Sequence, residues 1–188
     1  DTIVTHGWLT RLEEVLNIPN TAAAGPLSNY VAGLQQAGLF CSEIEEIQDK
    51  PNLAAEKLIS VNKAKTIITK FLIGFCLAIR RDVLDREGYL DETLFLGNED
   101  IELSWRLRLK GYDLRIALDC YVYHEGQQSF ITEKKSKTEE LVRESTERLY
   151  SKLIRYYGKW NVPTPKELWG MDWFAPTNPN YNTSARIE

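Results

Sequence analysis

The sequence predicts an α/β fold, because strand-like segments alternate with helical segments along most of the chain. The strand-like segments are rich in small, β-branched or aromatic apolar residues, and they cover residues 2–4, 21–29, 66–81 and 112–126. The helical segments carry apolar residues at helical spacing, and they cover residues 5–17, 49–65, 81–92, 99–110 and 132–158. The segment 30–48 is mixed in character and is expected to be a long connection.

Length and composition indicate one soluble globular domain with a substantial core. The chain has 188 residues, of which 43% are hydrophobic and 27% are charged. Its formal net charge of −4 gives no overall attraction to nucleic acid or to an anionic membrane. No apolar run approaches the ~20 residues that a membrane-spanning helix needs. The longest run, at 71–79, is expected to be a buried strand, within a segment 66–81 that predicts one or two central strands. The segment 112–126 predicts two short strands, followed by His124.

Cysteine usage indicates a reducing compartment. The three cysteines, Cys41, Cys76 and Cys120, are an odd number and lie far apart in the sequence. Because no C-x-x-C pair occurs, they predict neither a zinc ribbon nor a disulfide framework. A cytoplasmic location is therefore expected.

Local signals define the first helices. The helix that ends near Asn17 would bury one apolar face, made of Trp8, Leu12, Val15 and Leu16. Pro51 suits the first turn of the next helix. Gly88 is expected to stop the short helix that begins near Arg81.

The segment 97–111 gives conflicting signals. Apolar residues occupy every second position, at Ile101, Leu103, Trp105, Leu107 and Leu109, which favours a strand. The acids Glu99 and Asp100 suit the start of a helix, basic residues suit its end, and Gly111 is a natural stop. We choose the helix. The alternation then gives two apolar faces, which predicts a helix that packs on two sides.

Residues 132–158 predict a long amphipathic helix that ends at Gly158, followed by a Pro- and Trp-rich tail that is expected to lie over the domain. Basic residues repeat beside an apolar row, at Arg148, Lys152, Arg155 and Lys159. Such a surface can lie on an anionic membrane, or its apolar row can pack on the core while the basic stems cover the rim. The second arrangement is commoner, and a weak contact of 148–160 with the inner membrane face stays open.

An ordered set of motifs fills residues 74–130. A strand "GFCLAIRR" leads to a helix and "GYLDE"; the pair "ED" precedes a helix that ends in "RLRLKGY"; a strand then ends in "YHEGQQS". This set resembles the C-terminal half of the family 2 glycosyltransferases, which have the GT-A fold. The N-terminal "DTIVTHGWLTRLEEVL" and "AAAGPLSNYVAGLQ" resemble the part of that family that follows its metal-binding acidic motif.

The resemblance implies a partial GT-A domain over residues 1–131, with a Rossmann-like mixed sheet flanked by helices. A helical and Pro/Trp-rich extension would occupy 132–188. Asp1 then matches the last acid of the family's Asp-x-Asp-type motif. The family's nucleotide-binding half has no counterpart in the 188 residues, so we expect a fragment that does not hold a nucleotide sugar alone.

The resemblance also implies roles for the acidic pair. In the family, the acid that matches Asp100 is the general base of an inverting transfer, and Glu99 would be its supporting neighbour. A base must lie within hydrogen-bond reach of the acceptor hydroxyl. A helix start holds Asp100 rigidly and lowers its basicity, which the like charge of Glu99 partly offsets. The alternative is that both acids only complement the helix dipole.

Further roles follow from the same resemblance. His124 would bind a divalent metal, Mn²⁺ or Mg²⁺, together with Asp1, since imidazole and carboxylate are suitable ligands. Gly74 and Phe75 would lie along the cleft for the sugar and the acceptor. The alternatives, a strand-end histidine without a metal and a glycine that only packs closely on a neighbour, stay open.

Two side chains of the 99–110 helix have competing interpretations. Arg106 could bind a substrate phosphate or orient the loop of Asp100, but a solvated ion pair with Glu102, four residues away, is favoured. Trp105 could stack on a sugar, but a core position is favoured because it lies on an apolar helix face.

Two functional hypotheses result. The first is an inverting, metal-dependent glycosyltransferase of polysaccharide biosynthesis, which transfers a sugar from a nucleoside-diphosphate donor to a glycan or other hydroxyl acceptor. The second is a non-catalytic glycan- or partner-binding module derived from such a domain. No nucleic-acid partner is expected.

Overall fold

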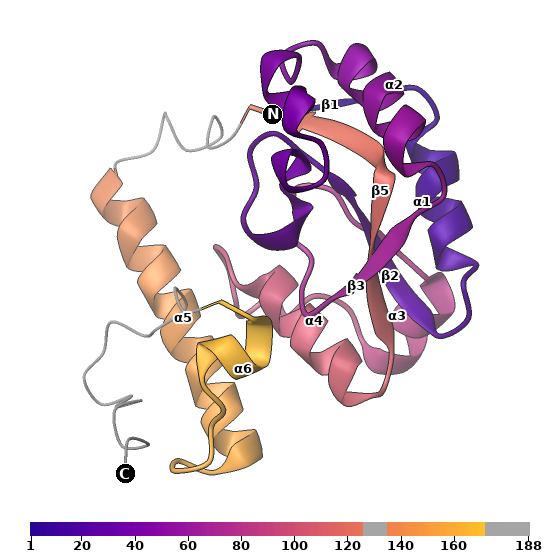
Figure 1. Ribbon diagram of the computed structural model, residues 1–188. Coiled ribbons are helices and arrows are strands. Elements are labelled where there is room, and N and C mark those ends of the chain that lie inside the picture. Colours follow the sequence, from indigo (N-terminus) through magenta and orange to yellow (C-terminus); the bar gives the residue numbers. More distant parts are fainter. Residues whose placement is uncertain (126–134, 172–188) are drawn as a thin grey trace, which may run out of the picture.

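The computed structural model describes residues 1–125 and 135–171. It confirms the α/β class, with a mixed five-stranded sheet flanked by helices (Figure 1). The long strand β5 (Asp113–His124) is central. It runs parallel to β2 (Thr21–Leu27), and β2 pairs on its other side with the short antiparallel strand β4 (Ala78–Ile79).

Two short antiparallel strands share the other edge of β5. β1 (Thr2–Val4) pairs with the end of β5, where Thr2 lies opposite His124. β3 (Thr66–Thr69) pairs with its beginning. The N-terminus therefore lies beside the carboxyl end of β5, where His124 is located (Figure 1).

Three helices pack near the sheet as the sequence predicted. α1 (Trp8–Leu16) buries Leu12 and Val15 against sheet residues. α2 (Pro51–Asn62) begins at the predicted proline and packs in the main core. α3 (Arg81–Glu87) ends at Gly88. The long connection before α2 holds only three short 3-10 turns.

The alternating segment is the helix α4 (Glu99–Leu109), as its end signals predicted. Leu103 and Leu107 belong to the core formed with the sheet. Ile101 and Trp105 belong to a second core formed with the C-terminal helices, which confirms the core position of Trp105. The alternation of apolar residues thus reflects a helix that is buried on two sides.

Three strand predictions are wrong in part. The segment 71–79 is a loop up to β4, although Phe71 and Leu72 are buried. The strands of segment 66–81, predicted to be central, are the short strands β3 and β4 at the two edges of the sheet. The segment 112–126, predicted to hold two strands, contains the single strand β5, whose register against β2 shifts after Pro26.

The C-terminal helices α5 (Lys135–Tyr157) and α6 (Pro165–Trp169) lie beside α4 (Figure 1). The apolar row beside the basic residues consists of Leu149, Leu153, Tyr156 and Trp160. Its first two members pack in the second core with Trp169, whereas Tyr156 and Trp160 are 59% and 73% exposed. The expected domain boundary after residue 131 and the rest of the tail, including Trp173, lie outside the described residues. Within those described, no helix has both the length and the apolar character to cross a membrane.

Candidate active site

The loop between β3 and β4 is held by side chains rather than by a neighbouring strand. Three successive amides donate to side-chain oxygens: Leu72 to Ser104 Oγ at 3.1 Å, Ile73 to Gln35 Oε1 at 2.8 Å, and Gly74 to Asp100 Oδ2 at 2.6 Å. Ser104 and Asp100 are one helical turn apart on α4, so they face the same side of that helix. This side of α4 therefore fixes the path of the loop and places Gly74 against Asp100.

The Asp100 carboxylate is held by backbone amides. Besides the Gly74 amide on Oδ2, the Ile101 amide donates to Oδ1 at 2.7 Å. Burial raises the pKa of Asp100 to about 6; the charge of Glu99 adds to this effect, and the amides of Gly74 and Ile101 oppose it. Such a carboxyl group is ionised at neutral pH and is more basic than an ordinary aspartate, which suits a general base.

Glu99 is the first residue of α4 and lies beside Asp100. Its Oε2 atom is buried and accepts no hydrogen bond from any residue that the structure describes. Buried polar atoms usually have partners, so this oxygen is available to a polar group that enters the site. Glu99 and Asp100 therefore place two carboxyl groups next to each other in the sequence at the N-terminal end of α4.

The start of α4 is tied to α5 by polar contacts. The Ser145 hydroxyl donates to the Gly97 carbonyl, the Asn98 amide group donates to Thr146 Oγ1 at 3.0 Å, and Lys152 Nζ lies 2.6 Å from Glu102 Oε1. Lys152 also pairs with Asp91 at 2.6 Å. Burial alone would lower the pKa of Lys152, but these two carboxylates outweigh it and the pKa is raised. This member of the basic row of α5 is therefore directed into the protein.

Arg106 makes the ion pair that the sequence favoured, at 3.1 Å from Glu102, but the pair is not solvated because Glu102 is 0% exposed. The Arg106 guanidinium also donates to three carbonyls at the end of α3, those of Glu87, Gly88 and Tyr89. The contacts of Arg106 thus hold α3 to α4. A role in substrate binding or in orienting Asp100 stays a prediction.

Asp1 and His124 face each other at the end of β5. Asp1 Oδ1 lies 3.4 Å from His124 Nε2. His124 Nδ1 lies 2.8 Å from the Tyr30 carbonyl oxygen, which can only accept, so Nδ1 carries the proton. The Asn29 side chain fixes the backbone of His124. Its amide oxygen accepts the His124 N–H at 2.8 Å, and its amide nitrogen donates to the His124 carbonyl at 3.0 Å. With Nδ1 held by Tyr30, Nε2 is the ring atom that faces the Asp1 carboxylate, and a cation that displaces any proton there could bridge the two.

The Asp1 and His124 pair fits a divalent metal by its donors. Mn²⁺ and Mg²⁺ accept carboxylate oxygen and imidazole nitrogen. Neighbouring ligands of an octahedral metal with bonds of about 2.1 Å lie about 3 Å apart, close to the separation seen here. In the described ranges, no group of three or more His, Cys, Asp or Glu residues gathers around a point. Asp1 and His124 would thus be two of the ligands of such a metal.

Phe75 connects the two parts of the site. Its ring stacks on the His124 imidazole, with ring centres 5.2 Å apart and planes 15° from parallel. The preceding residue is Gly74, whose amide holds Asp100. A β-carbon on Gly74 would lie only 3.3 Å from Asp100 Oδ2, so the absence of a side chain permits this approach. One loop therefore contacts both the candidate base and the candidate metal pair.

The structure thus gathers most of the predicted site residues: Asp100, Glu99, Gly74, Phe75, Asp1 and His124. Sequence reasoning missed Gln35, Asn29 and Tyr30, which support the loop and His124. All three lie in or next to the connection before α2, where polar residues are ordinary. The 1% exposure of Gln35 is visible only in the folded chain.

Comparisons with known proteins identify no family for this chain. No family model matches it, and no curated protein matches it significantly. The functional conclusion therefore depends on the geometry and chemistry of the residues described above.

Proposed function

We propose that this chain is the acceptor-side part of an inverting, metal-dependent glycosyltransferase of GT-A type. It would transfer a sugar from a nucleoside-diphosphate donor to a hydroxyl of a glycan or other acceptor. The surroundings of Asp100 carry this proposal: a partly buried carboxylate, held by amides at a helix start, with a pKa raised to about 6.

Asp100 takes the proton of the acceptor hydroxyl while that oxygen attacks the anomeric carbon and the diphosphate leaves. The two amides hold the carboxylate in one orientation, so it need not reorganise when the acceptor arrives. Glu99 Oε2 has no partner among the described residues and can accept a hydrogen bond from the acceptor or from a water molecule. The candidate base and the hydrogen-bond acceptor that would orient the substrate thus come from adjacent residues, Asp100 and Glu99.

Asp1 and His124 would hold Mn²⁺ or Mg²⁺. When bound, the metal neutralises the charge that develops on the departing diphosphate. The chain's own contribution is to fix the two ligands: the Tyr30 carbonyl sets the His124 tautomer, and Asn29 sets its backbone. Stacking of Phe75 on His124 couples this pair to the loop that contacts Asp100.

The first experiment tests Asp100 as the base. The complete product of the encoding gene is screened with nucleotide sugars and hydroxyl acceptors, with and without Mn²⁺. We expect Asp100→Asn to lower kcat by about 10²-fold to 10⁴-fold, while binding of the donor and of Mn²⁺ is retained. The control is Asp85→Asn, at an exposed position on α3. Near-normal transfer by Asp100→Asn would exclude the base assignment, and acceptor binding without transfer by the wild type would favour the non-catalytic module.

The second experiment tests the metal pair, and the two histidines of the chain provide a matched comparison. Paramagnetic Mn²⁺ should broaden the ring signals of His124 in NMR spectra at concentrations that leave exposed His6 unchanged. His124→Gln should weaken Mn²⁺ binding more than tenfold, whereas His6→Gln should not. Equal broadening of both rings would argue against a metal site at His124.

A further inference from the structure

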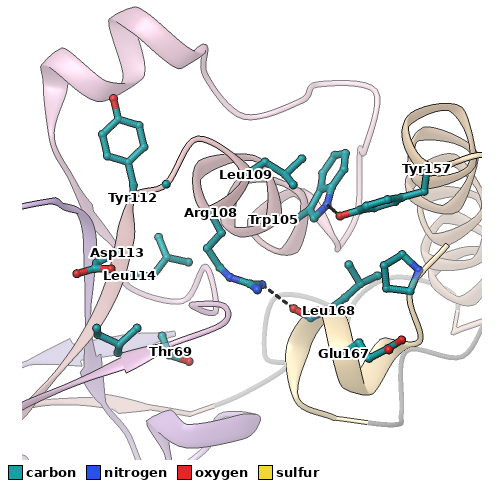
Figure 2. Close-up of a pocket in the computed structure, with 13 residues that line it drawn as sticks. Thr69, Trp105, Arg108, Leu109, Tyr112, Asp113, Leu114, Tyr157, Glu167 and Leu168 are labelled. Atoms are coloured by element: carbon teal, nitrogen blue, oxygen red, sulfur yellow. Dashed lines mark hydrogen bonds between the residues drawn. The ribbon is translucent and has the colours of Figure 1, made fainter. Parts of the chain in front are cut away.

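A separate cavity lies at the opposite end of α4, between the edge strand β3 and the C-terminal helices (Figure 2). Its volume is about 520 Å³, within the range of small-molecule sites. The apolar side chains of Ile68 and Leu109 and the aromatic Tyr157 line it. Asp100 and Arg108 are separated by about 12 Å along the helix, so this cavity is distinct from the candidate active site.

The Arg108 guanidinium lies in the middle of the cavity (Figure 2). Its Nη1 atom donates to the carbonyls of Leu168 at 2.6 Å and Lys70 at 3.1 Å. Arg108 has no carboxylate partner in the described part of the chain. Burial lowers its pKa, and only the phenol of Tyr157 opposes this effect. Carbonyls satisfy one nitrogen, but the positive charge has no counter-charge.

The two carboxylates at the cavity do not neutralise Arg108. Asp113 pairs with Arg115 at 3.0 Å. Glu167 Oε2 accepts the Thr164 amide at 2.7 Å, as part of the capping box at the start of α6. The cavity therefore keeps a partly buried cation, which is unfavourable unless an anion joins it.

A second hydrogen-bond donor faces the same cavity. The Tyr157 hydroxyl accepts from Trp105 Nε1 at 3.1 Å, so its own hydrogen is free to donate (Figure 2). Among residues 1–125 and 135–171, no acceptor is bonded to Arg108 Nε or Nη2, so these atoms can make a planar, two-point contact of the kind that carboxylates and phosphates make. The rest of the wall is mixed: Ile68, Leu109 and Leu114 are apolar, whereas Thr69 and the already engaged carboxylates of Asp113 and Glu167 are polar.

We propose that this cavity binds a small organic anion, whose carboxylate or phosphate pairs with Arg108 and whose apolar body lies against Ile68 and Leu109. The guanidinium gives the charge selectivity, and the Tyr157 hydroxyl adds a neutral donor. The inference does not depend on the proposed transferase activity, because none of these residues belongs to the Asp100 and His124 site.

The test is an NMR titration of the chain with three probes: phenyl phosphate, benzoate and the neutral benzyl alcohol. We expect at least one anion to shift the indole N–H signal of Trp105 saturably and at least tenfold more tightly than benzyl alcohol. The anion that binds more tightly identifies the group. Absence of a shift with both anions, or equal binding of the alcohol, would overturn the proposal.

Variants locate the binding. Arg108→Met keeps the apolar stem and should weaken the better anion at least tenfold; unchanged affinity would overturn the proposal. Because Arg108 also holds α6, a second variant, Ile68→Glu, adds a repelling charge at an exposed position of the wall. It should weaken the anion about tenfold, while the control Leu9→Glu, exposed on α1, leaves affinity unchanged. Equal affinities of these two variants would place the anion elsewhere and overturn the proposal.

Discussion

The first helical turns of α4 carry two carboxylates with opposite surroundings. Asp100 receives only backbone amides, and burial raises its pKa to about 6. Glu102, two residues later, is 0% exposed but lies between Arg106 and Lys152. A buried carboxylate with two cations ties helices together, whereas the two amides at Asp100 offset its desolvation only in part and leave its pKa raised. The presence or absence of neighbouring cations, rather than burial itself, therefore distinguishes the structural acid Glu102 from the candidate base Asp100.

The largest expected effect comes from a change at Glu102, the structural carboxylate of this comparison. Glu102→Gln removes the charge that compensates Arg106 and Lys152, so the free energy of unfolding should fall by about 3 kcal/mol. Urea unfolding at pH 7 measures it. The control Glu13→Gln makes the same change at an exposed position of α1 and should cost less than about 0.5 kcal/mol. Equal losses would show that the Glu102 cluster stabilises nothing.

The next effect concerns the contribution of Asp100 to the free energy of unfolding. Its pKa of about 6 in the folded chain exceeds the value of about 3.9 in an unfolded chain. The stability that this group contributes is present below pH 4 and is lost as pH rises through 6. Asp100→Asn should therefore exceed the wild type in unfolding free energy by about 3 kcal/mol at pH 8 and by little at pH 4.

A matched variant should show the opposite sign. Although burial opposes it, hydrogen bonds from Lys152 and Thr93 lower the pKa of Asp91 to about 2. The stability contributed by Asp91 is present above pH 4 and is lost as pH falls toward 2, so Asp91→Asn should destabilise the chain at pH 7. Urea unfolding across pH 3 to 8 compares the two variants. Curves of the same sign would contradict the assigned surroundings.

A smaller effect concerns catalysis. If Asp100 is the base, kcat/KM should rise with pH and level off above about 6, and the rate at pH 5 should be about one tenth of its plateau. Initial rates at constant Mn²⁺ measure this profile. A profile that is flat between pH 5 and 7 would exclude Asp100 as the titrating group.

The smallest effect adjusts the contact between Gly74 and Asp100. Gly74→Ala places a β-carbon 3.3 Å from Asp100 Oδ2, so the neighbours must move by a few tenths of an ångström. We expect a loss of about 1 kcal/mol in unfolding free energy, and a changed amide shift of residue 74 in NMR spectra. Gly97→Ala is no suitable control because its φ is 75°. Gly38→Ala is the better control: φ does not restrict it, and its β-carbon would meet only the flexible Glu45 side chain, at 3.2 Å.

The sequence predicted best where signals are local. Acids at the start of α4 and a glycine after its end identified a helix against its alternating pattern. An apolar run, in contrast, looks the same whether its amides bond to a strand or to side chains, and Gln35 and Ser104 lie far from the loop that they hold. Asp119 interrupts the apolar run of β5, but Arg11 pairs with it at 2.7 Å and the strand continues.

The same difference between local signals and contacts between distant residues limited how much of the candidate site could be predicted. Asp100 and His124 could be named from motif order, because each lies at the end of a recognisable element. Their supporting partners could not, since Asn29 reaches His124 across 95 positions of the sequence. Partners at such separations are set by the sheet topology, which a short sequence window does not contain.

The contacts between α4 and α5 also set an order of events during synthesis. Asn98 cannot form its hydrogen bond until Thr146 has been synthesised, 48 residues later. Likewise, β1 cannot pair until the end of β5 has been synthesised. A nascent chain emerges from the ribosome N-terminus first, so the turn before Asp100 lacks its clamp until α5 has left the exit tunnel. The acidic turn of the candidate site therefore stays without these contacts while the next 48 residues are synthesised.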